Sequence, residues 1–177
     1  MNFITGEKLQ SLAQLVIGTK KQIKFHKNFN TFTKNYLILE NQKDIILNLE
    51  EIKKYKIIFI YGDYISFFFD NIITSLKNIV LITHNGDNGV KQEFYKFLNY
   101  DNILKWYGVN IQFTHPKLVA LPIGIANLQW KHGNLHLLKK IIDKNNNKDN
   151  LLFINFSVKT NPNKRKDIKN ILSKKFT

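Results

Sequence analysis

The sequence predicts an α/β protein with a mostly parallel sheet flanked by helices. Continuous apolar runs that are typical of buried strands, Lys56–Tyr61 and Ile79–Thr83, alternate with segments of helical periodicity such as Tyr64–Leu76. Strands that alternate with helices form parallel sheets, because each crossover returns the chain to the same end of the sheet. With 44% hydrophobic and 13% aromatic residues, the 177-residue chain can build a folded core.

The elements expected before residue 56 are short. Apolar residues recur at helical spacing over Thr5–Gly18 and predict a first helix there. Glu7 falls in the first turn of that helix, where the helix dipole favours a carboxylate. Gln22–Phe25 and Tyr36–Leu39 have the composition of short strands, and Lys43–Glu51 is expected to form a short helix.

Strands and helices continue to alternate after residue 83. The expected elements are a helix over Val90–Leu98, strands over Ile103–Tyr107 and Leu118–Leu121, a helix over Asn134–Ile142, a strand over Leu151–Phe156 and a helix over Lys164–Phe176. The polar run Asp143–Asn150 cannot pack in a core and predicts a linker. We therefore expect one domain over residues 1–143, a linker over residues 144–150 and the start of a second domain over residues 151–177.

The net charge of +14 is strongly positive, but its distribution argues against a dedicated nucleic-acid protein. Of the 27 lysine and arginine residues only Arg165 is an arginine, and the lysines are scattered along the chain. Such a charge attracts anionic partners without specificity. The chain has no cysteine, which excludes disulfides, thiolate metal sites and cysteine nucleophiles.

Neither a membrane span nor a secretory signal is expected. No apolar run approaches the roughly 20 residues of a membrane-spanning helix. The first ten residues lack a basic region followed by an apolar one. The expectation is a cytoplasmic protein with no specific nucleic-acid partner.

Three polar segments follow predicted strands, at the edge where parallel sheets bind their ligands. The first is the loop Thr83–Gly89, in which His84 and Asp87 could act in acid–base chemistry or bind hydroxyls. The simpler interpretation is a strand-to-helix turn in which Asn88 or Asp87 caps the next helix. The glycine spacing matches neither a dinucleotide-binding fingerprint nor a Walker loop.

In the second segment, His115–Asn134, Pro122 and Gly124 end a short predicted strand, and the residues after them show no helical or strand periodicity. Its polar and aromatic side chains include Asn127, Gln129, Trp130 and His132. Amide and indole donors beside an aromatic face are typical of sugar-binding sites. A metal site of His115, His132 and His136 is disfavoured, because no partner falls at a recognised ligand spacing. The alternative is a crossover with a packed tryptophan.

The third segment, Phe153–Arg165, contains the one arginine, just inside a predicted helix. A guanidinium in a chain that otherwise uses lysine suggests planar, bidentate recognition of an anion. With Asn161 or Asn163 near the helix start, backbone N–H groups could receive a phosphate. The alternative for Arg165 is a surface salt bridge.

Taken in order, Thr83–Asp87, Lys105–Asn110, His115–Lys117 and Leu121–Asn134 resemble the exostosin-type glycosyltransferases, and more narrowly the short exostosin-like proteins of large DNA viruses and protists. Phe153–Arg165 is similar to the point where the second domain of that family begins. The resemblance implies a GT-B architecture, in which two Rossmann-like domains enclose the active site. It implies transfer of a sugar from a nucleotide-sugar donor to an acceptor hydroxyl on a glycan or protein, with no cofactor or essential metal.

Roles for individual residues follow from the resemblance together with their loop positions. His84 or Asp87 is expected to act as the general base. The residues expected to line the cleft are Asn85, Asn127, Gln129, Trp130 and His132. Asn161 and Arg165 are expected to bind the donor phosphates and neutralise the leaving diphosphate.

The chain departs from the family in the length of its second domain, which ends after a single strand and helix. A truncated donor domain implies a fragment, a split gene product or a degenerate copy that is inactive alone, and an exposed sheet edge that promotes association. The alternative function is a noncatalytic module that binds a glycan or, through its charge, nucleic acid.

Overall fold

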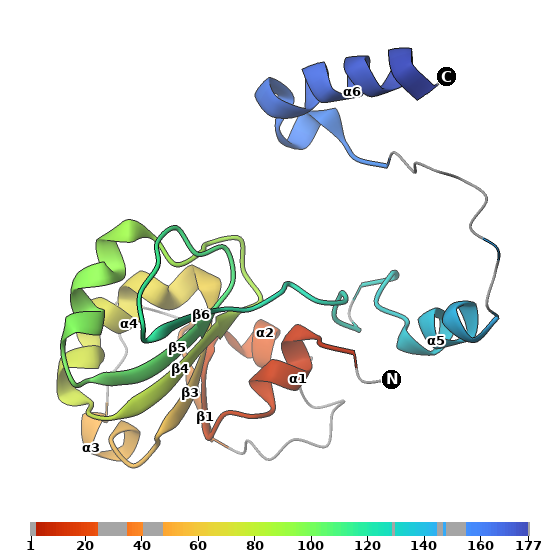
Figure 1. The fold of residues 1–177 in the computed structure, drawn as a ribbon. Helices are drawn as coiled ribbons and strands as arrows, with labels where there is room; N and C mark the ends of the chain where they lie inside the picture. Colours follow the sequence, from red (N-terminus) through yellow and green to blue (C-terminus); the bar gives the residue numbers. More distant parts are fainter. Residues whose placement is uncertain are drawn as a thin grey trace. The chain divides into compact units, whose positions relative to one another are not determined.

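The computed structural model describes residues 3–24, 35–40, 48–128, 130–144, 147 and 155–176 (Figure 1). The chain divides into two compact units, Met1–Leu135 and His136–Thr177.

The first unit is built on a six-stranded parallel sheet, which confirms the predicted α/β, Rossmann-like class. The strands are β1 (Leu15–Gly18), β2 (Asn35–Ile38), β3 (Ile57–Tyr61), β4 (Ile79–His84), β5 (Ile103–Gly108) and β6 (Leu118–Ala120). Their order in the sheet is β2-β1-β3-β4-β5-β6. The order changes direction between β1 and β3, and parallel sheets bind ligands beside such a switch point, at the carboxyl ends of the strands.

The strand register brings the polar loops to one edge of the sheet. Tyr61 at the end of β3 pairs with His84 at the end of β4. Thr83 pairs with Gly108 of β5, and Gly108 pairs in turn with Ala120 of β6. Because all strands run in the same direction, the loops after β3, β4, β5 and β6 begin side by side.

Helices cover both faces of this sheet. They are α1 (Gly6–Gln10), α2 (Lys20–Lys24), α3 (Leu49–Ile52), α4 (Ile65–Asn71) and the 3-10 segments η2 (Gly62–Tyr64), η3 (Ile73–Ser75) and η4 (Gln92–Asn99). Phe68 of α4 belongs to the larger core cluster, with Trp106 of β5. Phe59 of β3 and Ile23 of α2 belong to the cluster on the other face. Figure 1 shows α4 on one side of the strands and α1 and α2 on the other.

The prediction of one helix over residues 5–18 was wrong. The helix ends at Gln10, and Leu15–Gly18 forms β1, which lies between β2 and β3 in the sheet. All four residues of β1 are buried. A strand that is covered on both faces has a continuous apolar sequence. Because a run of four apolar residues also fits helical spacing, the sequence pattern did not distinguish this strand from a helix.

The prediction of a strand over residues 22–25 was also wrong, since Lys20–Lys24 forms α2. Thr19 and Gln22 explain the helix start. The Thr19 N–H donates to Oε1 of Gln22 at 2.8 Å, and the Gln22 N–H donates to Oγ1 of Thr19 at 3.3 Å. This is the reciprocal pairing of a capping box.

The remaining expected elements of the first unit are confirmed, with differences in detail. The helix over residues 64–76 is divided into η2, α4 and η3, and that over residues 90–98 is the 3-10 segment η4. The helix expected over residues 43–51 is seen as α3, and residues 41–47 lie outside the described part.

The second unit contains η5 (Val158–Thr160), α6 (Pro162–Phe176) and all but the first residue of α5 (Leu135–Asp143). The helices expected over residues 134–142 and 164–176 are thus present. Most of the strand expected over residues 151–156 lies outside the described residues. Within the described part of the chain, no helix is both long enough and apolar enough to span a membrane.

The position of β1 predicts effects of very different size for two residues that helical spacing would place on one apolar face. Ile17 is fully buried in β1, whereas Leu12 is 60% exposed. We expect Ile17→Ala to lower the free energy of unfolding by about 2–5 kcal/mol, and Leu12→Ala by less than about 0.5 kcal/mol. Denaturant unfolding measures both changes, and similar losses for the two variants would contradict a buried strand at residues 15–18.

Candidate functional site

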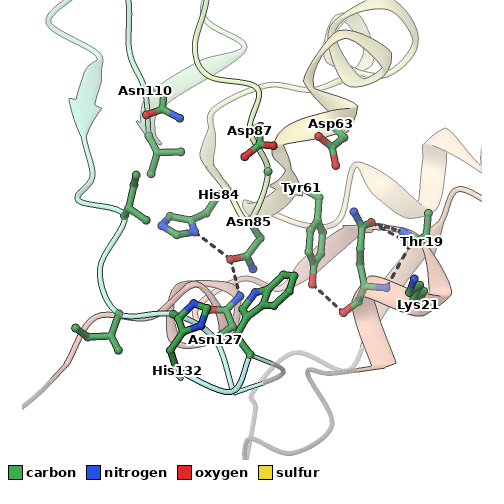
Figure 2. A pocket seen from close by; sticks show the side chains of 17 residues that line it. Thr19, Lys21, Tyr61, Asp63, His84, Asn85, Asp87, Asn110, Asn127 and His132 are labelled. Carbon is green, nitrogen blue, oxygen red and sulfur yellow. Dashed lines mark hydrogen bonds between the residues drawn. The ribbon is translucent and has the colours of Figure 1, made fainter. Parts of the chain in front are cut away.

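A pocket of about 800 Å³ lies at the carboxyl ends of the strands of the first unit. Its walls come from the segments that follow β1, β3, β4, β5 and β6 (Figure 2). The volume is within the range of about 300 to 1,000 Å³ for pockets that enclose small-molecule ligands. The sheet therefore presents a cavity at the edge where its topology favours binding.

Two of the three predicted segments meet in this pocket. His84, Asn85 and Asp87 line it from the loop after β4, and Asn127, Trp130 and His132 line it from the segment after β6. The side-chain amide of Asn127 donates to Oδ1 of Asn85 at 2.9 Å, which joins the two segments directly. Gln129, the remaining predicted lining residue, lies outside the described residues.

His84 is the most buried polar side chain of the pocket wall, with 5% of its surface exposed. Its Nδ1 lies 3.0 Å from Oδ1 of Asn85. The hydrogen bond from the Asn127 amide identifies this atom as the oxygen of the Asn85 side chain, and an amide oxygen only accepts, so Nδ1 is the donor and neutral His84 carries its proton there. Nε2 is left as the acceptor, and within the described part of the chain it has no hydrogen-bond partner.

The backbone around the pocket has an unusual conformation at two positions. Asn85 has φ of 58° and Asn110 has φ of 50°. Left-handed backbone is uncommon outside glycine, although asparagine tolerates it better than most residues. Such conformations persist where the surroundings hold them, and they gather at functional sites.

An exposed aromatic pair borders the pocket next to Asn127. Trp130 is 56% exposed, and its ring stacks on His132 with centroids 6.2 Å apart and planes 16° from parallel. The turn that presents it is closed by the Trp130 N–H, which donates to the Asn127 carbonyl at 3.0 Å. An exposed indole face beside side-chain amides can stack on a sugar ring while the amides bind its hydroxyls.

Asp87 is exposed at the pocket rim, and Asp63 joins it from the loop after β3. Figure 2 shows both carboxylates toward the top of the view, with Asn127 and His132 toward the bottom. Sequence reasoning did not select Asp63, nor Asn110 and Lys21, which also line the pocket. The rule that selected His84 could have found Asp63 and Asn110, since each follows the end of a strand.

Tyr61, at the end of β3, is a buried part of the wall that sequence reasoning also missed. Its hydroxyl donates to Oε1 of Gln10 at 2.7 Å and lies 3.0 Å from the Gln22 carbonyl oxygen. Burial raises the pKa of Tyr61 far above its usual value. The phenol therefore stays protonated and ties α1 and α2 to the sheet, rather than acting as a base.

Glu7 lies behind the pocket wall and is 3% exposed. Its Oε1 accepts the backbone N–H of Leu128 at 2.8 Å. Burial raises the pKa of this carboxyl above its ordinary 4.5, while hydrogen bonds from the Leu128 N–H and the Thr5 side chain act in the opposite direction. The sequence indicated an acid in a first helical turn but not its burial, because Leu128 is 121 residues away.

The third predicted pair, Asn161 and Arg165, belongs to the second unit. The Arg165 guanidinium donates to the Ser157 carbonyl at 3.0 Å and to the Thr160 hydroxyl. It also lies over the ring of Phe156, 5.9 Å from the centroid. Their expected role at the donor phosphates stays a prediction.

Within the described residues, no group of three or more His, Asp or Glu side chains is placed to hold a metal ion. His115, considered above for such a site, instead accepts the Lys117 N–H at 3.0 Å through Nδ1 and packs edge-on against Tyr95. The arrangement of the pocket is suited to hydrogen bonding, aromatic stacking and proton transfer at Nε2 of His84.

Comparison of the chain with protein-family models, with curated proteins and with solved structures finds no match. The resemblance to exostosin-type glycosyltransferases therefore rests on the sequence motifs alone.

The burial of Glu7 predicts a pH-dependent change in stability. Because its folded pKa is raised above 4.5, the stability that the protonated carboxyl provides is complete below 4.5 and is lost as the pH rises through the folded value. Glu7→Gln does not titrate, so its free energy of unfolding should rise relative to wild type as the pH increases from below 4.5 to neutrality. Denaturant unfolding at the two pH values checks this, with Glu93→Gln as the exposed control. A constant difference would contradict a raised pKa.

Proposed function

We propose that this protein binds a sugar-containing substrate in the pocket of its first unit and transfers a glycosyl group from a nucleotide sugar to an acceptor hydroxyl. The observation that carries the proposal is Nε2 of His84, a buried acceptor that has no partner within the described part of the chain and belongs to a side chain that lines the pocket. The exposed face of Trp130 and the amides of Asn85 and Asn127 support a sugar as the bound group.

His84 supplies the base in this proposal. As the acceptor oxygen attacks the anomeric carbon, its proton moves to Nε2, and the bond from that carbon to the diphosphate breaks with its electron pair on the leaving group. The hydrogen bond from Nδ1 to Asn85 holds the ring in the tautomer that can accept this proton. Burial and tautomer favour His84 over the exposed Asp87 as the base. The roles of Asn161 and Arg165 at the diphosphate rest on the resemblance.

A noncatalytic glycan-binding module is the second candidate. The stacked pair Trp130 and His132, beside Asn127, could bind a sugar without any proton transfer. The two functions share the pocket and differ only in turnover. The strong positive charge adds nucleic acid as a further ligand to test.

His84 and Trp130 should have separable effects if the proposal is correct. His84→Gln keeps a polar side chain but removes the base, so transfer should slow by about 10²- to 10⁴-fold while the substrate still binds. Trp130→Ala should weaken binding by roughly tenfold, about 1.4 kcal/mol, and Trp130→Phe should restore most of it. A transfer assay and calorimetric titration with a panel of nucleotide sugars measure these changes.

Three outcomes discriminate between the candidates. Full transfer by His84→Gln, with its fold confirmed by circular dichroism, would exclude His84 as the base. Saturable binding of a sugar with no transfer to any acceptor would support the binding module. Affinity only for nucleic acid, falling steeply as salt increases, would indicate electrostatic attraction and contradict a sugar pocket.

A further inference from the structure

The outer wall of the pocket, residues 123–133, is attached to the first unit through the N-terminal segment, residues 4–7. The Ile125 N–H donates to the Ile4 carbonyl at 2.8 Å, and Thr5 forms an isolated parallel bridge with Ile125. These are main-chain contacts between segments at opposite ends of the unit. They add a short extra pairing beyond the end of β6.

Two glycines allow this close approach. Gly124 has φ of 74°, and a Cβ at this position would lie 2.4 Å from the Ile4 carbonyl oxygen. A Cβ on Gly6 would lie 1.6 Å from Oδ1 of Asn85 and 2.9 Å from Oδ1 of Asn127. The N-terminal segment is therefore packed directly against the groups that orient His84.

Among the described residues 128 and 130–132, the side chains of the wall beyond Asn127 are exposed. Leu128 and Trp130 are both about half exposed. The turn over residues 127–133 is closed internally, by the Trp130 N–H to the Asn127 carbonyl and the Gly133 N–H to the Trp130 carbonyl. Hydrogen bonds to the rest of the unit therefore contribute to where this turn lies.

Glu7 provides one of those hydrogen bonds, at the cost of burying a carboxylate. Its Oε1 accepts the Leu128 N–H, directly before the turn that carries Trp130 and His132. Among the aspartate, glutamate and histidine side chains that the structure describes, Glu7 and His84 are the two that are buried. Burying an acidic side chain is unfavourable unless it is hydrogen-bonded, and the Leu128 N–H supplies a hydrogen bond to Oε1.

We propose that Glu7 is a positioning residue, which holds the wall of the pocket across from His84 by accepting the Leu128 N–H. Glu7 does not line the pocket and touches no substrate; it acts through the turn that presents Trp130 and His132. The inference deepens the proposed function, because it names what fixes the sugar-stacking side of the same pocket. Without the acceptor, the wall keeps its hydrogen bonds through Ile125 and Asn127.

The test compares two variants of similar size that differ in the acceptor oxygen. Glu7→Gln keeps an oxygen at the position of Oε1, and Glu7→Met removes it. The protein is labelled with 5-fluorotryptophan, which gives one ¹⁹F resonance for Trp130 and one for Trp106, assigned with Trp130→Phe. Trp106 is fully buried and bonded to Thr83, so it serves as the internal reference. Glu93→Met, an exposed acid in the first turn of η4, is the matched control.

We expect the Trp130 resonance of Glu7→Met to shift and broaden toward that of the unfolded chain while the Trp106 resonance stays in place. Glu7→Gln and Glu93→Met should both retain the wild-type Trp130 resonance. An unchanged Trp130 resonance in folded Glu7→Met would overturn the proposal. Equal changes at both tryptophans would also overturn it, because they would show a general loss of packing.

A measurement on the wild-type protein covers the case in which Glu7→Met does not fold. The Leu128 amide should be protected from hydrogen exchange although its side chain is half exposed, and rapid exchange would overturn the proposal. Neither readout uses a ligand or an activity. If the protein transfers no sugar but both readouts agree with the expectation, Glu7 is the positioning residue of a binding pocket. Failure of the proposed transfer activity is therefore distinguishable from failure of the proposed role of Glu7.

Discussion

The side-chain carbonyl of Asn85 is the point on which the pocket depends. It accepts from Nδ1 of His84 and from the amide of Asn127, and so fixes both a histidine tautomer and the position of a separate chain segment. It reaches both donors because Asn85 takes a left-handed backbone conformation directly after β4. The space it occupies exists only because residue 6 is glycine. A single amide group thus links the end of the sheet, the first helix and the outer wall.

The parallel sheet explains why these groups meet at all. Strands that run in one direction end at one edge, and the register places Tyr61, His84 and Gly108 next to one another in neighbouring strands. The change of direction between β1 and β3 adds the segment after β1, with Lys21, to the same pocket. Buried apolar residues on both faces hold the strands, so the polar loops can differ without loss of the core.

The sequence predicted the fold class, and it predicted the loops of the site that follow continuously buried strands. The strands β3 and β4 were found because runs such as Ile57–Tyr61 are buried on both faces. The strand β1 was missed because its four residues extend the apolar spacing of the preceding helix, and Thr19 and Lys21 were missed with it. His84 and Trp130 were selected because polar residues after a strand are informative in a parallel sheet.

The features of the site that the sequence did not predict depend on contacts between residues far apart in the chain. Glu7 accepts a hydrogen bond from Leu128, and Asn85, which fixes the tautomer of His84, accepts one from Asn127; each partner is far away in the chain. Arg165 drew attention as the one arginine of the chain, and within its own unit it is bonded to Ser157 and Thr160. Its proposed role comes from the resemblance rather than from any periodicity.

The most direct test of the central claim is a map of amide and side-chain NMR shifts in the ¹⁵N-labelled protein during titration with nucleotide sugars and the corresponding free sugars. A ligand pocket at the strand ends predicts saturable shifts at Asn85, Asn110 and Asn127, at the indole N–H of Trp130 and at the ring of His84. Shifts confined to the lysines of α6 that vanish as salt is added, or no shifts at the strand ends with any sugar, would contradict it.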